Sequence, residues 1–147
     1  MDPEPGWKNP PTFGRGAHPS GLYSFTSDAV RYPAFPPYSW VVKHLVLPNF
    51  AVFGWFALLL ETALGAFLLV GLATRLWALV GVGQTVAISL SVLRVPGEWH
   101  WSYLLMLLVH LALFATAAGR YGGVDGVLRD RWRASSGRLS RALVAAS

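Results

Sequence analysis

Three long apolar stretches dominate the pattern of hydrophobic and polar positions along this chain. They run from Leu47 to Ala73, from Leu76 to Leu93 and from Trp101 to Gly119. Each is long enough to cross the hydrocarbon core of a membrane, which needs roughly 20 apolar residues as a helix. The pattern therefore predicts an all-α membrane protein with three transmembrane helices, over about residues 48–72, 75–93 and 101–119. The first of these helices is expected to end at Gly71, because glycine is a common C-cap residue.

One strongly polar residue interrupts each stretch near its middle: Glu61, Gln84 and His110. A polar group at this depth finds no water unless neighbouring helices provide partners, so such groups are candidates for function. We expect Glu61 and His110 to face one shared cavity or contact, with Gln84 nearby. Two alternatives stay open, because the three side chains can form hydrogen bonds that only hold helices together, or can line a site for another small molecule.

The first stretch also carries small residues on the face of its polar residue. Ala57, Glu61 and Gly65 follow one another at spacings of four. Because small residues let a second helix approach closely, we expect Glu61 to point into a helix interface. On the second helix Gln84 shares a face with Gly81 and Thr85, and we expect these polar faces to converge inside one bundle.

Residues 1–46 form an N-terminal region that is much less apolar. It is rich in Pro and Gly as far as Ser20 and is expected to be a loop there. Residues 22–32 can form a short helix or stay irregular. Residues 38–47 suit a short interfacial helix, with Pro37 as its first residue. The helix would place four residues on one face, which either lies on the membrane surface or packs as a lid on the bundle: Trp40, Val41, His44 and Leu45.

The composition agrees with a membrane protein. Of 147 residues, 54% are hydrophobic and only 13% are charged, against about 25% charged residues in soluble chains. Several of the seven tryptophans lie near the ends of the apolar stretches, as in interfacial aromatic belts. The absence of cysteine excludes disulfides, thiolate metal sites and dithiol chemistry within this chain. No metal site is expected, and the basic residues form no patch that would indicate a nucleic-acid partner.

The basic residues predict the orientation in the cell inner (plasma) membrane. Six of the twelve Lys and Arg residues follow the last apolar stretch, and the positive-inside rule places this region in the cytoplasm. Residues 47–132 then form the transmembrane domain, residues 94–100 an outer loop, and residues 133–147 a basic, loosely ordered tail near anionic lipid. Residues 1–46 would lie outside, although no leading helix precedes them. We therefore expect an upstream transmembrane helix; translocation of a short N-terminal tail is the alternative.

Three further side chains have both a structural and a functional interpretation. Arg75 follows an inner turn, where it either anchors the helix at lipid phosphates or contacts an anionic substrate. Tyr103, beside Glu98 and His100, either belongs to the interfacial anchor or lines a substrate gate at the outer face. Asp125 is expected to cap a short helix over residues 126–132; its alternative is an ion pair with an arginine.

The chain resembles the DoxX/DoxD family of small four-helix membrane proteins. The resemblance rests on the run LETALGAFLLVGLATRLWAL from Leu60 to Leu79 and on AAGRYGGVDGVL from Ala117 to Leu128. These contain a membrane Glu followed by Gly, a "GL-x-TR" turn and a late "GR-x-x-x-x-D". The early GWKNPPTF resembles the segment that follows the family's first helix. The resemblance thus implies three helices of a four-helix DoxX-type bundle, without the first.

The resemblance also implies a role. DoxD-type proteins are the small subunit of a thiosulfate:quinone oxidoreductase, and related DoxX proteins are associated with membrane complexes in redox or oxidative-stress defence. A quinone is then the expected ligand, with Glu61 as proton acceptor and His110 as hydrogen-bond partner of the quinone oxygen. The chain has no motif that carries electrons, so a partner redox subunit or bound cofactor is expected; a homo-oligomer stays open. The alternative is a non-catalytic membrane anchor or assembly subunit.

Overall fold

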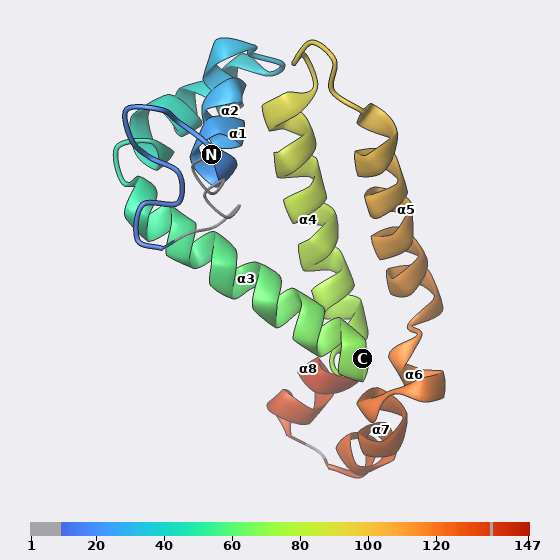
Figure 1. Cartoon of the computed structure of the whole chain (residues 1–147). Helices are drawn as coiled ribbons and strands as arrows, with labels where there is room; N and C mark the ends of the chain where they lie inside the picture. The colour runs from blue at the N-terminus through green and yellow to red at the C-terminus, as the bar shows by residue number, and fades with distance from the viewer. Residues whose placement is uncertain (1–9, 136) are drawn as a thin grey trace, which may run out of the picture. The chain divides into compact units, whose positions relative to one another are not determined.

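Every regular element in the described part of the chain, residues 10–135 and 137–147 of this computed structural model, is a helix (Figure 1). In chain order the elements are α1 (Gly21–Arg31), α2 (Pro36–Val41), the π-helical turn η1 (Val42–Val46), α3 (Phe50–Val70), α4 (Thr74–Val92), α5 (His100–Thr116), α6 (Gly119–Gly122), α7 (Val124–Ala134) and α8 (Arg138–Ala146). The all-α prediction is therefore confirmed. The first nine positions of the expected N-terminal loop lie outside the described residues.

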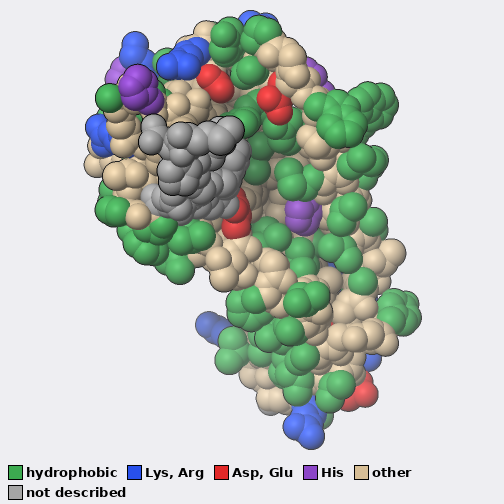
Figure 2. All heavy atoms as spheres, in the orientation of Figure 1, with side chains coloured by type: hydrophobic (Ala, Val, Ile, Leu, Met, Phe, Trp, Pro, Cys, Tyr) green, Lys and Arg blue, Asp and Glu red, His purple; other side chains and the backbone are tan. Residues whose placement is uncertain are grey.

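Two helices, α3 and α4, are long and apolar enough to cross a membrane. α5 is apolar but has only 17 residues; at 1.5 Å per residue it rises about 26 Å, slightly less than the ~30 Å hydrocarbon core. Only 11% of the apolar window of α3 and 28% of that of α4 is buried, whereas the core helix of a soluble protein would be mostly buried. Figure 2 shows many of the exposed hydrophobic side chains, as expected for helices that face lipid.

The end of α3 follows from the sequence. Gly71 adopts the left-handed backbone conformation with φ +67°, which glycine reaches without steric cost. The N–H of Gly71 donates to the Leu68 carbonyl oxygen at 3.3 Å, and the N–H of Leu72 donates to that of Phe67 at 3.0 Å. This pair of bonds is the Schellman motif that ends many helices. The prediction of Gly71 as the C-cap is confirmed.

The chain folds as two compact units, and α3, α4 and α5 each contribute to both. The first unit contains residues up to Leu60 together with Val86–Tyr103. At its core the ring of Phe13 is fully buried, lies against Gly54 and meets the ring of Trp55 edge-on at 5.6 Å. A side chain at position 54 would occupy the space of this ring, so glycine there lets the N-terminal segment pack directly on α3.

The amphipathic segment of α2 and η1 packs in this first unit by a different face from the one expected. Tyr38 donates a hydrogen bond to the Ala87 carbonyl oxygen of α4 at 3.0 Å and lies 2.9 Å from the Ser91 hydroxyl, while Val42 is fully buried. The expected face is exposed instead: Trp40 by 58% and Leu45 by 56%. The segment therefore packs on α4, as the lid interpretation expected, but through Tyr38 and Val42, so the prediction of the packed face is wrong.

The second unit contains Glu61–Thr85 and Leu104–Ser147. The expectation of a loosely ordered tail is wrong here, because α8 covers most of it (Figure 1). The helix ends at Ala146, and its C-cap is the buried Ser147, whose main-chain oxygen accepts hydrogen bonds from Arg120 and Arg129. These long-range bonds, which composition alone does not indicate, fix the last helix.

Candidate functional site

Glu61 of α3 and Gln84 of α4 are hydrogen-bonded to one another. The Gln84 side-chain amide donates to Glu61 Oε1 at 2.8 Å. Both side chains are half-buried on otherwise apolar helices. A carboxyl group that receives an amide N–H loses part of the cost of leaving water. Two of the three intramembrane polar residues therefore lie together.

His110 of α5 packs against the other side chains of the same α4 segment. It is buried, with 9% of its surface exposed. Its Nδ1 lies 2.9 Å from the Met106 carbonyl oxygen and 3.4 Å from the Thr85 hydroxyl. Because a carbonyl oxygen can only accept, Nδ1 carries the proton in this bond. The neutral imidazole then has Nε2 as its basic nitrogen.

Gly81 makes room for the His110 ring. A Cβ atom at position 81 would overlap Cδ2 and Nε2 of His110. One turn later Thr85 donates its hydroxyl to the Gly81 carbonyl oxygen at 2.8 Å. The sequence placed Gly81 and Thr85 on the face of Gln84, but it did not identify them as the residues that position His110.

The α4 segment from Gly81 to Thr85 therefore carries both polar contacts. Gln84 bonds to Glu61, and the consecutive residue Thr85 lies beside His110. Consecutive residues point about 100° apart around a helix, so α4 presents one polar side chain to each of its two neighbours. A shared cavity for Glu61 and His110 stays a prediction.

The expected close approach at Gly65 is wrong. A Cβ atom at Gly65 would meet no described atom within 4 Å, and the residue is exposed. The close contacts of α3 lie elsewhere, at Gly54 within the first unit and at the Gly71 turn within the second. Small residues thus permit helix contact, but the spacing alone does not say which of them are used.

Asp125 caps α4 rather than its own helix. Its Oδ1 accepts the main-chain N–H of Ala73 at 2.7 Å, and its Oδ2 accepts that of Thr74 at 2.9 Å. The helix that contains Asp125, α7, has Gly123 at its N-cap and no side-chain cap bond. The expected local cap is therefore wrong. The carboxylate is fully buried and satisfies N–H groups of the first turn of another helix.

Three glycines bring this carboxylate to the turn. A Cβ atom at Gly71 would lie 2.7 Å from the Cα atom of Gly123 and 3.1 Å from that of Gly119. The N–H of Asp125 also donates to the Gly71 carbonyl oxygen at 2.9 Å. The two sequence motifs, the turn from Gly71 to Arg75 and the segment from Gly119 to Asp125, are thus one contact in the fold.

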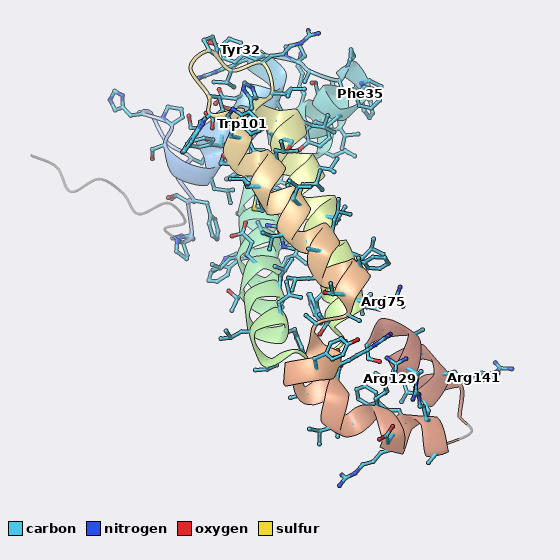
Figure 3. The ribbon with its side chains drawn as sticks, turned by 90° about the vertical axis from the view of Figure 1, so that its right-hand side faces the viewer. Tyr32, Phe35, Arg75, Trp101, Arg129 and Arg141 are labelled. Atoms are coloured by element: carbon cyan, nitrogen blue, oxygen red, sulfur yellow. The ribbon has the colours of Figure 1, made fainter. Side chains whose placement is uncertain are left out.

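Arg75 lies directly after this capped turn (Figure 3). Its guanidinium carbon is 4.8 Å from the centre of the Phe114 ring of α5, a cation–π contact. Its Nε is buried and has no hydrogen-bond partner among the described residues. Arg75 is therefore held in place by an aromatic ring, while part of its hydrogen-bonding capacity remains unused.

Tyr103 belongs to the first unit, at the start of α5. Its hydroxyl donates to Glu98 Oε1, while His100 Nε2 donates to the Leu93 carbonyl oxygen at 2.8 Å. These bonds tie the loop between α4 and α5 to the start of α5. Among the described residues, no three His, Cys, Asp or Glu side chains are grouped so that they could hold a metal ion.

Comparison with known proteins identifies the family. No curated protein and no solved structure matches the chain. The family described as TQO small subunit DoxD matches residues 35–145, about three quarters of the chain. The match begins after the early Gly6–Phe13 segment and includes all three apolar stretches, the Gly71 turn and the Gly119–Asp125 segment. This match, together with the exposed apolar helices, shows that the chain belongs to the DoxD family of membrane proteins.

Proposed function

We propose that this protein is a multi-pass inner-membrane subunit of a quinone-linked redox complex, of the thiosulfate:quinone oxidoreductase type. Its contribution would be a site for the quinone and its protons, built on Glu61, Gln84 and His110. The family supports the role of small subunit. In this arrangement α3, α4 and α5 all cross the membrane, residues 94–100 lie outside and the basic C-terminal region lies inside.

The observation that carries the proposal is the bond between Glu61 and Gln84. Reduction of a quinone consumes two protons as well as two electrons, so a site within the membrane needs groups that exchange protons. A carboxyl group does this, and an amide beside it holds the carboxyl in one orientation. General acid–base assistance of this kind contributes about 10²–10⁴ in rate.

His110 would serve as the hydrogen-bond partner of the quinone oxygen. Since Nδ1 donates to the Met106 carbonyl oxygen, Nε2 is the nitrogen left for a ligand. In the neutral ring Nε2 accepts the O–H of a hydroquinone, and in the imidazolium it donates to the carbonyl oxygen of a quinone. The Met106 bond thus sets which nitrogen exchanges a proton.

Arg75 and Tyr103 are proposed to bind substrate at the two ends of the helices. Arg75 has an unused Nε and a positive charge suited to an anionic substrate. Tyr103, bonded to Glu98, would line a gate at the outer face. Electrons from a sulfur donor would reach the quinone through a bound cofactor or a partner subunit, since the chain has no cysteine.

A second candidate function is a non-catalytic anchor or assembly subunit. The same Glu61–Gln84 bond favours it, because it joins α3 to α4 directly. Interhelical hydrogen bonds of this kind contribute about 0.6–2 kcal/mol to helix association. In this role Glu61 would act by its shape and hydrogen bonding, and its ability to exchange a proton would be irrelevant.

The substitution Glu61→Gln separates the two functions, because it keeps size and hydrogen bonding but removes the titrating group. We expect the complex to assemble normally and to reduce quinone about 10²-fold more slowly, the lower end of acid–base assistance. Asp130→Asn is the control, because it removes an α7 carboxylate whose side chain is 89% exposed. Equal quinone-reduction rates for Glu61→Gln and wild type, at equal membrane abundance, would leave the anchor function.

A further inference from the structure

Three arginines gather in the second unit around the capped turn, and we call them the arginine cluster: Arg75, Arg120 and Arg129. They come from the start of α4, from α6 and from α7. Arg120 and Arg129 both donate to the main-chain oxygen of Ser147, from Nη2 of Arg120 at 2.6 Å and from Nη1 of Arg129 at 3.3 Å. Two guanidinium groups thus converge on a single main-chain oxygen.

Among the described residues, the acidic side chain beside this cluster is Asp125, and its carboxylate already accepts two main-chain N–H groups. The Nε atoms of Arg75 and Arg129 are buried without a hydrogen-bond partner among the described residues. Like charges held close together and partly removed from water repel one another, which raises the free energy of the folded protein. An anion that binds beside them lowers this electrostatic free energy.

The ionisation of Arg129 reflects this crowding. Burial lowers the pKa of its guanidinium, and the positive charges of Arg120, Arg133 and Arg75 lower it further, against the opposing effect of Asp125. Arg133 lies 4.0 Å from Asp130 and so has a carboxylate of its own. Within the part of the chain that the structure describes, none of the three arginines of the cluster forms an ion pair with an acidic side chain.

We propose that the arginine cluster binds a phosphate group, supplied either by the headgroup of an anionic lipid or by free phosphate. Guanidinium groups match phosphate oxygens with paired, charge-assisted hydrogen bonds. All three side chains are only partly buried, so a ligand reaches them. The cluster is also positioned in advance, because Phe114 holds Arg75 and the Ser147 oxygen holds Arg120 and Arg129.

The place of the cluster along the chain suits a phosphate at the membrane surface. Arg75 is the second residue of α4, and exposed apolar residues follow immediately, beginning with Leu76. Headgroup phosphates lie where an apolar helix leaves the hydrocarbon core, and a basic residue there is attracted to anionic lipid. A cluster of three with fixed geometry would bind one headgroup rather than the surface as a whole.

The test uses the full chain purified in a neutral detergent. Phosphatidylglycerol and, separately, inorganic phosphate at constant ionic strength are titrated while thermal unfolding is followed, and retained lipid is counted by native mass spectrometry. We expect wild type to be stabilised, and Arg75→Gln and Arg129→Gln to weaken the apparent affinity about ten- to a hundredfold, as for the loss of one charge-assisted hydrogen bond. Arg141→Gln is the matched control, because Arg141 of α8 is exposed and points away from the cluster (Figure 3).

The outcomes separate the sources of the phosphate. Stabilisation by phosphatidylglycerol alone identifies a lipid site, and stabilisation by inorganic phosphate alone identifies a site for the free ion; both ligands acting would mean that the site accepts either. Arg75→Lys provides a second variant in case Arg75→Gln does not fold. It keeps the positive charge but lacks the planar guanidinium that forms paired hydrogen bonds, so it should bind more weakly than wild type. No stabilisation of wild type by either ligand, or an equal loss in Arg141→Gln, would overturn the proposal.

Discussion

The carboxylate of Asp125 lies 2.9 Å from the main-chain nitrogen of Thr74, which is 51 residues away in sequence. With the second bond to Ala73, it satisfies two N–H groups at the first turn of α4. Ala73 itself has a positive φ of 50°, a conformation that is costly for a residue with a side chain. The hydrogen bonds to Asp125 offset the conformational cost of Ala73 and hold the start of α4 against α7.

Asp125→Asn should destabilise the protein by about 1–3 kcal/mol. Both carboxylate oxygens of Asp125 accept a main-chain N–H group, but asparagine has an NH₂ group in place of one oxygen. One of the two buried main-chain N–H groups would then face another donor and lose its acceptor. Thermal unfolding in detergent measures the change. Asp130→Asn, at an exposed position of the same helix, should change stability by less than about 0.5 kcal/mol. Equal effects of the two substitutions would contradict the capping role.

Gly123→Ala should destabilise the same contact, whereas Gly122→Ala should not. A Cβ atom at position 123 would lie 2.6 Å from the Cα atom of Gly71, and one at position 122 would meet no described atom within 4 Å. Overpacking against backbone costs about 1–3 kcal/mol. The measurement is again thermal unfolding of both variants. If Gly123→Ala unfolds no earlier than Gly122→Ala, the three glycines do not define the turn contact.

Gly81→Ala should displace His110, and Gly83→Ala provides the control. The new methyl group at position 81 would overlap the imidazole, whereas at position 83 it would meet no described atom within 4 Å. We expect a loss of about 1–3 kcal/mol for Gly81→Ala and a slower quinone reduction in the assembled complex. Unfolding temperature and turnover are measured on both variants. A Gly81→Ala complex with wild-type turnover would show that the position of His110 is unimportant for activity.

The orientation in the membrane gives a further prediction. The C-terminal region, which carries Arg138 and Arg141 on α8, should lie in the cytoplasm, and the loop of residues 94–100 should lie outside. Reporter fusions at Ser147 and within the loop test both ends of α5. A reporter that is active in the periplasm when fused at Ser147 would reverse the orientation.

The sequence allowed correct predictions of contacts and helix ends at residues whose chemistry differs sharply from that of their neighbours in the chain. Glu61 and Gln84 are isolated polar groups in apolar stretches, and the need for a hydrogen-bond partner in such a place brings them together. Gly71 was likewise predicted as the helix end, because a left-handed residue there favours glycine. Both predictions depend on local physical requirements that allow few solutions.

The contacts that the sequence did not reveal join positions far apart in the chain. Asp125 stands at the beginning of a short helix, so a local cap was the natural interpretation, and nothing nearby indicates a partner at Thr74. The tail was expected to be loosely ordered because of its Arg, Ser and Ala content. It forms α8, whose end is held by Arg120 and Arg129 at Ser147.

The contact between the Gly71 turn and Asp125 also limits how the chain can vary in length. Gly119, Gly123 and Asp125 must meet that turn together, so their spacing is fixed by three separate contacts. One residue inserted into a helical turn rotates the residues after it by about 100° and would move the carboxylate away from its two N–H partners. Insertions and deletions should therefore be excluded from the segment between positions 119 and 125, and any variation in length in this region should fall beyond the end of α7.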